Sequence, residues 1–114
     1  MRIAVTAAGT TLRSPMDIRF GRAPVILIYD TETRDTEVID NRSSDAMTHG
    51  AGLQTVQRMV SHTVDTVITT DCGPKAFEAL KKSGITVYHT DAPTAFEALA
   101  LYQHGFLKPM VLTQ

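Results

Sequence analysis

The sequence has only one cysteine, little net charge and no long hydrophobic run. A single cysteine, Cys72, cannot form an intrachain disulfide, and one thiolate cannot complete a tetrahedral zinc site or hold an iron-sulfur cluster in the usual four-cysteine way. Eleven Lys and Arg residues against twelve Asp and Glu residues leave a net charge of -1, without the basic excess that nucleic-acid binding needs. We therefore expect a reducing compartment and no nucleic-acid partner.

Membrane-targeting features are also missing. No segment approaches the roughly 18 apolar residues of a membrane span, and the N-terminal run meets Gly9 before an apolar stretch of signal-peptide type develops. We expect a cytoplasmic protein without membrane contact. The chain of 114 residues, 43% apolar and 20% charged, suits a single domain over residues 1–114 whose core needs no disulfide.

Hydrophobic patterning predicts an α/β fold. Short apolar runs indicate strands, and apolar residues at helical spacing indicate helices. The predicted strands cover residues 3–8, 25–29, 36–40, 64–70 and 85–89, and the predicted helices cover about 50–62, 73–83 and 91–103. The order β-β-β-α-β-α-β-α requires parallel later strands and an antiparallel hairpin, which predicts a mixed five-stranded sheet with three helices.

The predicted helices have inward faces that spacing assigns. These are Leu53, Val56, Met59 and Val60 in the first helix, Ala76, Phe77 and Leu80 in the second, and Phe96, Leu99 and Ala100 in the third. Ligands of open sheets bind beyond the carboxyl ends of parallel strands. The loops at residues 9–22, 70–74 and 89–93 lie at those ends, with residues 49–52 beside them, so we expect the site there.

Two of the predicted helices begin with glycine-rich segments, His49-Gly50-Ala51-Gly52 and Asp71-Cys72-Gly73-Pro74. Helix N-termini present unpaired N–H groups and a partial positive charge, and glycine lets a ligand approach the backbone. Together with Arg19 and Arg22, these segments predict an anion cradle. The alternative is that the glycines only form tight turns.

Two further side chains are candidates because they lie at these helix starts. His49 lies where a cation is disfavoured unless an anion is bound, and Cys72 lies in a setting that lowers a thiol pKa. The alternative for Cys72 is a buried, inert cysteine. The other histidines are expected at the surface or at strand ends: His62, His89 and His104.

The segment Phe20-Gly21-Arg22 lies within the long polar loop at residues 9–24. We expect Phe20 to pin this loop to the core and thereby to aim the arginine. Loops of this length inside a compact domain are functional or mobile. No Ser-His-Asp set, P-loop or carboxylate pair is evident in the chain, so no enzyme class is indicated.

The chain resembles the dinitrogenase iron-molybdenum cofactor biosynthesis family from Met1 to about Phe106. The matching segments are Arg2-Ile3-Ala4-Val5, Arg19-Phe20-Gly21-Arg22-Ala23-Pro24, Tyr29-Asp30-Thr31-Glu32-Thr33, Gly50-Ala51-Gly52 and Gly73-Pro74-Lys75-Ala76-Phe77. The resemblance implies a ribonuclease H-like three-layer fold and proteins that bind, carry or store molybdenum and iron-sulfur cluster precursors. One branch, the orange proteins, holds a molybdenum-copper sulfide cluster without covalent ligation. The chain differs from the family pattern at Asp71-Cys72.

The resemblance and the residues together predict a non-catalytic binding or carrier protein for a molybdenum- or iron-containing sulfide cluster. Such a cluster is a bulky anion whose metals already have sulfide ligands, so charge and N–H donors suffice to hold it. The predicted roles are charge from Arg19 and Arg22, backbone donors from Gly50, Ala51, Gly52 and Gly73, and a donor or soft metal ligand from His49 and Cys72. The resemblance implies partners among cluster-assembly or ATPase proteins, and we expect a monomer or weak homodimer.

Two other classes stay open. One is a small enzyme acting on an anionic substrate with His49 as general base, although no nucleophile or paired acid is evident. The other is a regulatory interaction module without cargo. Nuclease activity is not expected, because the first strand carries no Asp or Glu for a two-metal site.

Overall fold

The computed structural model describes residues 1–42 and 50–111. Within them the chain forms a sheet whose strands lie in the order β3-β2-β1-β4-β5-β6. The strands are β1 (Arg2–Ala7), β2 (Val25–Asp30), β3 (Thr36–Asp40), β4 (Thr66–Thr69), β5 (Thr86–His89) and β6 (Lys108–Pro109). The helices are α2 (Ala51–Ser61), α3 (Pro74–Lys82) and α4 (Ala95–Gln103).

Strand β1 is at the centre of the sheet and has neighbours of both orientations. It pairs antiparallel with β2 and parallel with β4, and β4 in turn pairs parallel with β5. The carboxyl ends of β1, β4 and β5 therefore meet at one edge of the sheet. The predicted mixed α/β fold, with an antiparallel hairpin followed by alternating strands and helices, is confirmed.

The expected number of five strands is wrong for the described residues, because β6 adds a sixth at the edge of the sheet. Strand β6 has two residues and pairs antiparallel with β5. A two-residue strand that contains a proline has no periodic pattern that a sequence can show. The ribonuclease H-like description of the fold stays a prediction.

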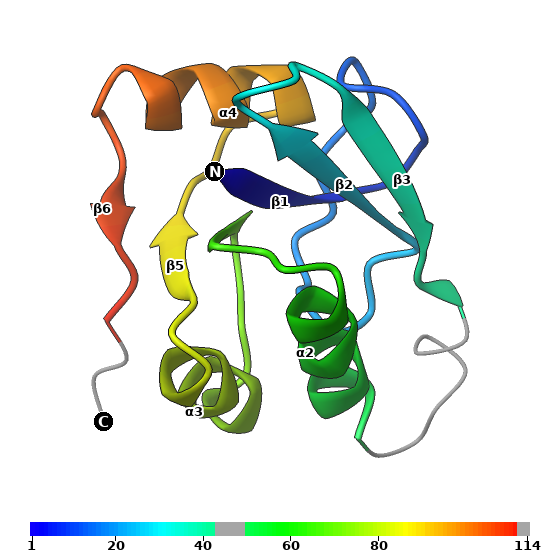
Figure 1. Ribbon diagram of the computed structural model, residues 1–114, viewed down its shortest axis with the longest axis vertical. Helices are drawn as coiled ribbons and strands as arrows, with labels where there is room; N and C mark the ends of the chain where they lie inside the picture. Colours follow the sequence, from blue (N-terminus) through cyan, green and yellow to red (C-terminus); the bar gives the residue numbers. More distant parts are fainter. Residues whose placement is uncertain (43–49, 112–114) are drawn as a thin grey trace.

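The sheet separates two hydrophobic cores, as Figure 1 shows with α2 and α3 on one side and α4 on the other. Successive strand residues point to opposite faces. On β1, Ala4 belongs to the core under α2 and α3, whereas Ile3 and Val5 belong to the core under α4. Neighbouring Val67 and Ile68 on β4 divide in the same way. Both faces of the sheet are therefore covered, which makes three layers.

The predicted inward orientation is wrong for three residues. Leu53 and Val60 of α2 are 43% and 50% exposed, and Phe96 of α4 is 58% exposed. The buried side of α2 instead consists of Ala51, Thr55, Val56 and Met59, and that of α4 of Ala95, Ala98 and Leu99. The stripe of α2 that faces the sheet runs through positions i, i+4, i+5 and i+8 from Ala51, so Leu53 and Val60 fall outside it, and Phe96 falls outside the corresponding stripe of α4. Among the described helices, none has the length and apolar character required to cross a bilayer.

Candidate functional site

The long loop between β1 and β2 lies along the segment that follows β4. The backbone N–H of Phe20 donates to the carbonyl of Asp71 over 3.0 Å, and the N–H of Asp71 donates to the carbonyl of Ile18 over 2.7 Å. Two segments about 50 residues apart in sequence are thus joined at the edge where the parallel strands end. This pairing places Arg19 beside Asp71, immediately before the start of α3.

Phe20 fixes this loop to the protein interior. Its side chain is 1% exposed and lies in the core beneath α2 and α3. The prediction that this ring pins the loop is confirmed. Pinning leaves Arg19 exposed and Arg22 half-buried at the edge of the sheet.

Close backbone packing joins the loop to the two helix starts. A Cβ atom added to Gly21 would lie 2.7 Å from the Cα of Gly52, and one added to Gly52 would lie 3.1 Å from the Cβ of Ala76. The loop therefore touches the first turn of α2, which in turn touches the first turn of α3. The structure brings together three of the predicted segments: the Phe20-Gly21-Arg22 loop, the Gly50–Gly52 turn and the Gly73 turn.

A buried polar cluster that the sequence did not reveal supports the same junction. Asn41 is fully buried, and its amide donates to the carbonyl of Ala23 over 2.9 Å. The hydroxyl of Thr55 on α2 donates to Asn41 Oδ1 over 3.2 Å and lies 3.3 Å from the carbonyl of Gly21. Arg58 also donates to Asn41 Oδ1. An asparagine after a strand is ordinarily a turn residue, so only the folded chain identifies Asn41 as a clamp.

The starts of α2 and α3 share an electrostatic character. Gly50 is the N-cap of α2, with a left-handed φ of 79°, and Gly73 is the N-cap of α3, followed by Pro74 at the first helical position. Within the described residues neither helix has a side-chain cap, and neither has an acidic residue in its first turn. Both ends therefore present the partial positive charge of a helix N-terminus to the same edge.

Arg19 adds positive charge to this edge, although part of that charge is matched by a neighbour. Its Nε lies 3.4 Å from Asp17 Oδ1, and its Nη2 donates to the carbonyl of Arg22 over 3.5 Å. The side chain is 55% exposed, so this pair holds it only weakly in place. An anionic ligand can compete with Asp17 for the guanidinium.

The pKa of the Cys72 thiol differs from the value expected at a helix start. Its side chain is 3% exposed, and burial, with a smaller contribution from the negative charge of Asp71, raises the pKa of the thiol to about 12. The expected lowering of the pKa by the helix start is wrong, because Cys72 precedes the N-cap of α3 and its side chain is buried in the core beneath α2 and α3. The predicted role of His49 lies outside the described residues.

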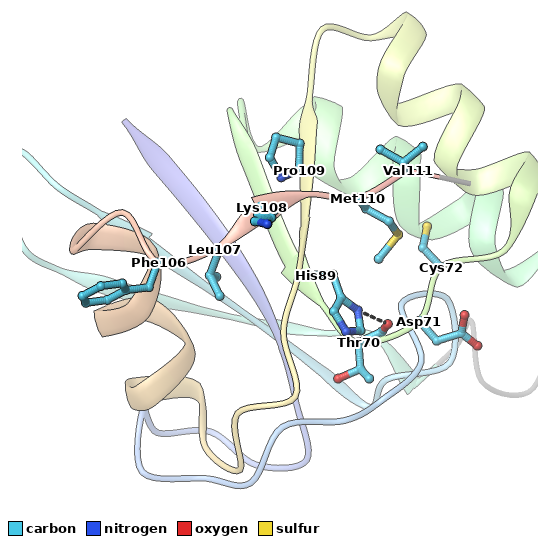
Figure 2. A pocket seen from close by; sticks show the side chains of 10 residues that line it. All are labelled: Thr70, Asp71, Cys72, His89, Phe106, Leu107, Lys108, Pro109, Met110 and Val111. Atoms are coloured by element: carbon cyan, nitrogen blue, oxygen red, sulfur yellow. Dashed lines mark hydrogen bonds between the residues drawn. The ribbon is translucent and has the colours of Figure 1, made fainter. Parts of the chain in front are cut away.

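Cys72 also lines a cavity of about 570 Å³ beside α3 (Figure 2). The walls come from the end of β4, from His89 at the end of β5, and from residues 106–111 around β6. The Nδ1–H of His89 donates to the carbonyl of Thr70 over 2.9 Å. Sequence reasoning placed His89 at a strand end but missed this cavity, since its outer wall comes from a segment without periodic pattern.

Within the described residues, no group of three or more His, Cys, Asp and Glu side chains could hold a metal ion. The arrangement at the strand ends is instead suited to an anion. Its features are two adjoining helix N-termini, glycines that allow close approach, and an exposed guanidinium.

Residues 1–105 match the model of the family described as dinitrogenase iron-molybdenum cofactor. The chain belongs to this family. The match covers the loop, both glycine turns and Cys72, and it ends before β6. The resemblance inferred from the sequence is thereby confirmed.

Solved structures of similar proteins share the fold. The apo form of the orange protein from Desulfovibrio gigas is 35% identical, covers 96% of this chain and 92% of its own, and superposes with a TM-score of 0.92. A protein from Thermotoga, solved by NMR, is 37% identical over 99% of this chain and 97% of its own, with a TM-score of 0.88. By sequence comparison, an uncharacterized protein of Methanocaldococcus jannaschii is 29% identical over 95% of this chain and 90% of its own.

Proposed function

We propose that this chain is a non-catalytic cytoplasmic carrier of a molybdenum- or iron-containing sulfide cluster, held without covalent ligation at the edge where α2 and α3 begin. The observation that carries the proposal is the junction of Gly21, Gly52 and Ala76, which places two helix N-termini side by side. Two adjoining positive helix ends suit a ligand larger and more charged than a single carboxylate.

A sulfide cluster fits this edge for chemical reasons. Its metals already have sulfide ligands, so the host needs N–H donors, positive charge and apolar contact rather than several cysteines. Gly50, Ala51, Gly52 and Gly73 supply backbone donors in this proposal, and Arg19 and Arg22 supply charge. Membership in the dinitrogenase iron-molybdenum cofactor family supports a cluster of this type and partners among cluster-assembly proteins.

The direct test uses apo protein purified anaerobically and mixed with tetrathiomolybdate, with and without copper. We expect a coloured complex that survives gel filtration. Colourless protein after desalting, with the fold confirmed by circular dichroism, would rule out a cluster of this kind.

Arg22 offers a sharper test of how the cluster is held. Lysine keeps the charge but loses the planar donor fork, whereas alanine loses both. We expect Arg22→Lys and Arg22→Ala to weaken binding alike, by on the order of 1 to 3 kcal/mol for a lost charge-assisted hydrogen bond. Visible absorbance titrations at two salt concentrations measure the effect, with exposed Arg13→Ala in the same loop as the matched control.

Two outcomes would change this picture. Wild-type affinity in Arg22→Lys together with a steep salt dependence would mean that general electrostatic attraction dominates. Unchanged affinity in Arg22→Ala would show that the loop serves folding and not the cargo.

A further inference from the structure

The cavity beside α3 contains two sulfur atoms from distant parts of the chain. Figure 2 shows the side chains of Cys72 and Met110 at the same end of the cavity, while the carboxylate of Asp71 points away. Met110 is partly buried and packs against the core that contains Cys72. The tail after α4 thus brings a thioether to the cavity that the Cys72 thiol also lines, although Cys72 lies 38 positions earlier in the sequence.

We propose that Cys72 Sγ and Met110 Sδ bind a single Cu(I) ion, at a site separate from the edge assigned above to the sulfide cluster. Thiolate and thioether are soft ligands, and a site made of only these two suits Cu(I), which is itself a soft ion. One thiolate and one monovalent ion carry no net charge together, which suits a position where Cys72 is 3% exposed. A zinc ion would leave an excess charge and need four ligands.

The other polar groups around the cavity are consistent with a two-sulfur site. The Nδ1–H of His89 donates to the carbonyl of Thr70, and its Nε2 lies 3.4 Å from Asp91 Oδ2, so each ring nitrogen already has a protein oxygen beside it. Lys108 is exposed, and its long flexible side chain keeps the ammonium group in water. A neutral copper-thiolate unit is little affected by either group.

Binding requires no change of oxidation state. The Cys72 thiol gives up its proton to solvent as the sulfur-copper bond forms, and Met110 donates a lone pair without losing any atom. One proton is therefore released for each Cu(I) bound. The cavity gives the ion a route to the buried sulfur from solvent.

The site depends on a part of the chain that the family match does not include. That match ends at residue 105, whereas Met110 and the outer wall of the cavity, residues 106–111, lie beyond it. The copper site is therefore not implied by family membership, and it stands or fails independently of the proposed cluster carrier.

The test titrates the full apo chain anaerobically with Cu(I), supplied as a complex with a chromophoric chelator, and omits molybdate and sulfide. We expect one Cu(I) per chain after desalting and an X-ray absorption spectrum with only sulfur ligands. Met110→Leu should weaken binding by more than about tenfold, the lower end of the effect of losing even an outer-shell partner. Cys72→Ser should abolish binding.

The matched control is Met59→Leu, which removes a methionine sulfur from the same core but away from the cavity. This variant should bind Cu(I) like the wild type. The proposal is overturned if wild-type protein retains no Cu(I), if Cys72→Ser retains one equivalent, or if Met110→Leu and Met59→Leu bind equally. If Cys72→Ser does not fold, the two methionine variants still decide the question.

Discussion

The helix N-termini on the two faces of the sheet differ in how they are capped. On the face of α4, the Thr94 side chain accepts from the N–H of Glu97 over 3.2 Å, and Glu97 places negative charge in the first turn. The N–H groups of Ala95 and Phe96 donate to carbonyls of the long loop, 3.1 Å and 2.7 Å away. On the other face, within the described residues, neither α2 nor α3 has a side-chain cap or an acidic first turn.

The same loop produces both situations. Its first half, through Leu12 and Ser14, satisfies the start of α4. Its second half, through Phe20 and Gly21, brings the exposed Arg19 to the starts of α2 and α3. The described residues therefore close the start of α4, whereas among them no side chain caps α2 or α3, whose first turns keep the partial positive charge of a helix N-terminus.

The largest change we expect comes from removing the anchor of this loop. Phe20→Ala should lower the free energy of unfolding by about 3–5 kcal/mol, because it leaves a cavity in the core. Urea denaturation measures the loss. Phe96→Ala on α4 is the matched control, and its exposed ring should change stability by no more than ~0.5 kcal/mol. Equal losses in both variants would show that Phe20 does not anchor the loop.

A glycine pair tests the contact between the loop and the helix starts. Gly21→Ala places a methyl group within 2.8 Å of the backbone of Gly52 and should cost about 1–3 kcal/mol of stability, since backbone must move. Gly73→Ala meets nothing within 4 Å and should not be destabilising. Thermal unfolding of both variants is sufficient, and a stable Gly21→Ala protein would contradict the observed packing.

The pKa of Cys72 predicts a loss of stability at high pH. The pKa is raised from 9.0 to about 12, so between these values the unfolded chain loses the thiol proton while the folded chain keeps it. The contribution of the Cys72 thiol to the free energy of unfolding is fully present below pH 9 and decreases as the pH rises. At pH 10 the decrease is about 1.4 kcal/mol. Urea midpoints of wild type and Cys72→Ala at pH 8 and pH 10 measure it. Parallel pH profiles would mean that the thiol titrates normally.

The smallest effects concern the caps themselves. Thr94→Ala should cost about 1 kcal/mol, because the Glu97 N–H loses its acceptor. Gly73→Ser, at an extended position with open space around it, should gain a few tenths of a kcal/mol by capping α3. A loss of stability in Thr94→Ala and a gain in Gly73→Ser would confirm that a side chain caps α4 but not α3. A destabilised Gly73→Ser protein would show that α3 is already capped. Chemical denaturation resolves both.

Much of the fold could be predicted because it depends on local chemistry. Apolar runs specified the first five strands, and Gly73-Pro74 and Gly84 marked the limits of α3 within one or two residues. The glycine turns and the arginine loop were identified as one edge, because parallel strands bring their carboxyl ends together. Phe20 was recognised as an anchor because a large apolar ring in a polar loop needs burial.

What the sequence did not reveal depends on contacts between distant segments. Spacing places Leu53, Val60 and Phe96 inward, yet a different stripe of each helix faces the sheet, and the rotation of a helix about its own axis is set by packing between the layers. The strand at Lys108–Pro109 forms only because β5 offers it a partner.

The sequence by itself determined the order of the elements, the glycine-rich helix starts and the position of the single thiol. Only the tertiary structure decided that Gly21 lies against Gly52, that the buried Asn41 holds the carbonyl of Ala23, and that Cys72 and Met110 line one cavity. The physical reason is that burial and electrostatic interactions depend on distances in the folded structure and not on positions in the sequence. A helix start lowers a thiol pKa only where the sulfur faces its N–H groups, and the core that encloses Cys72 raises it instead.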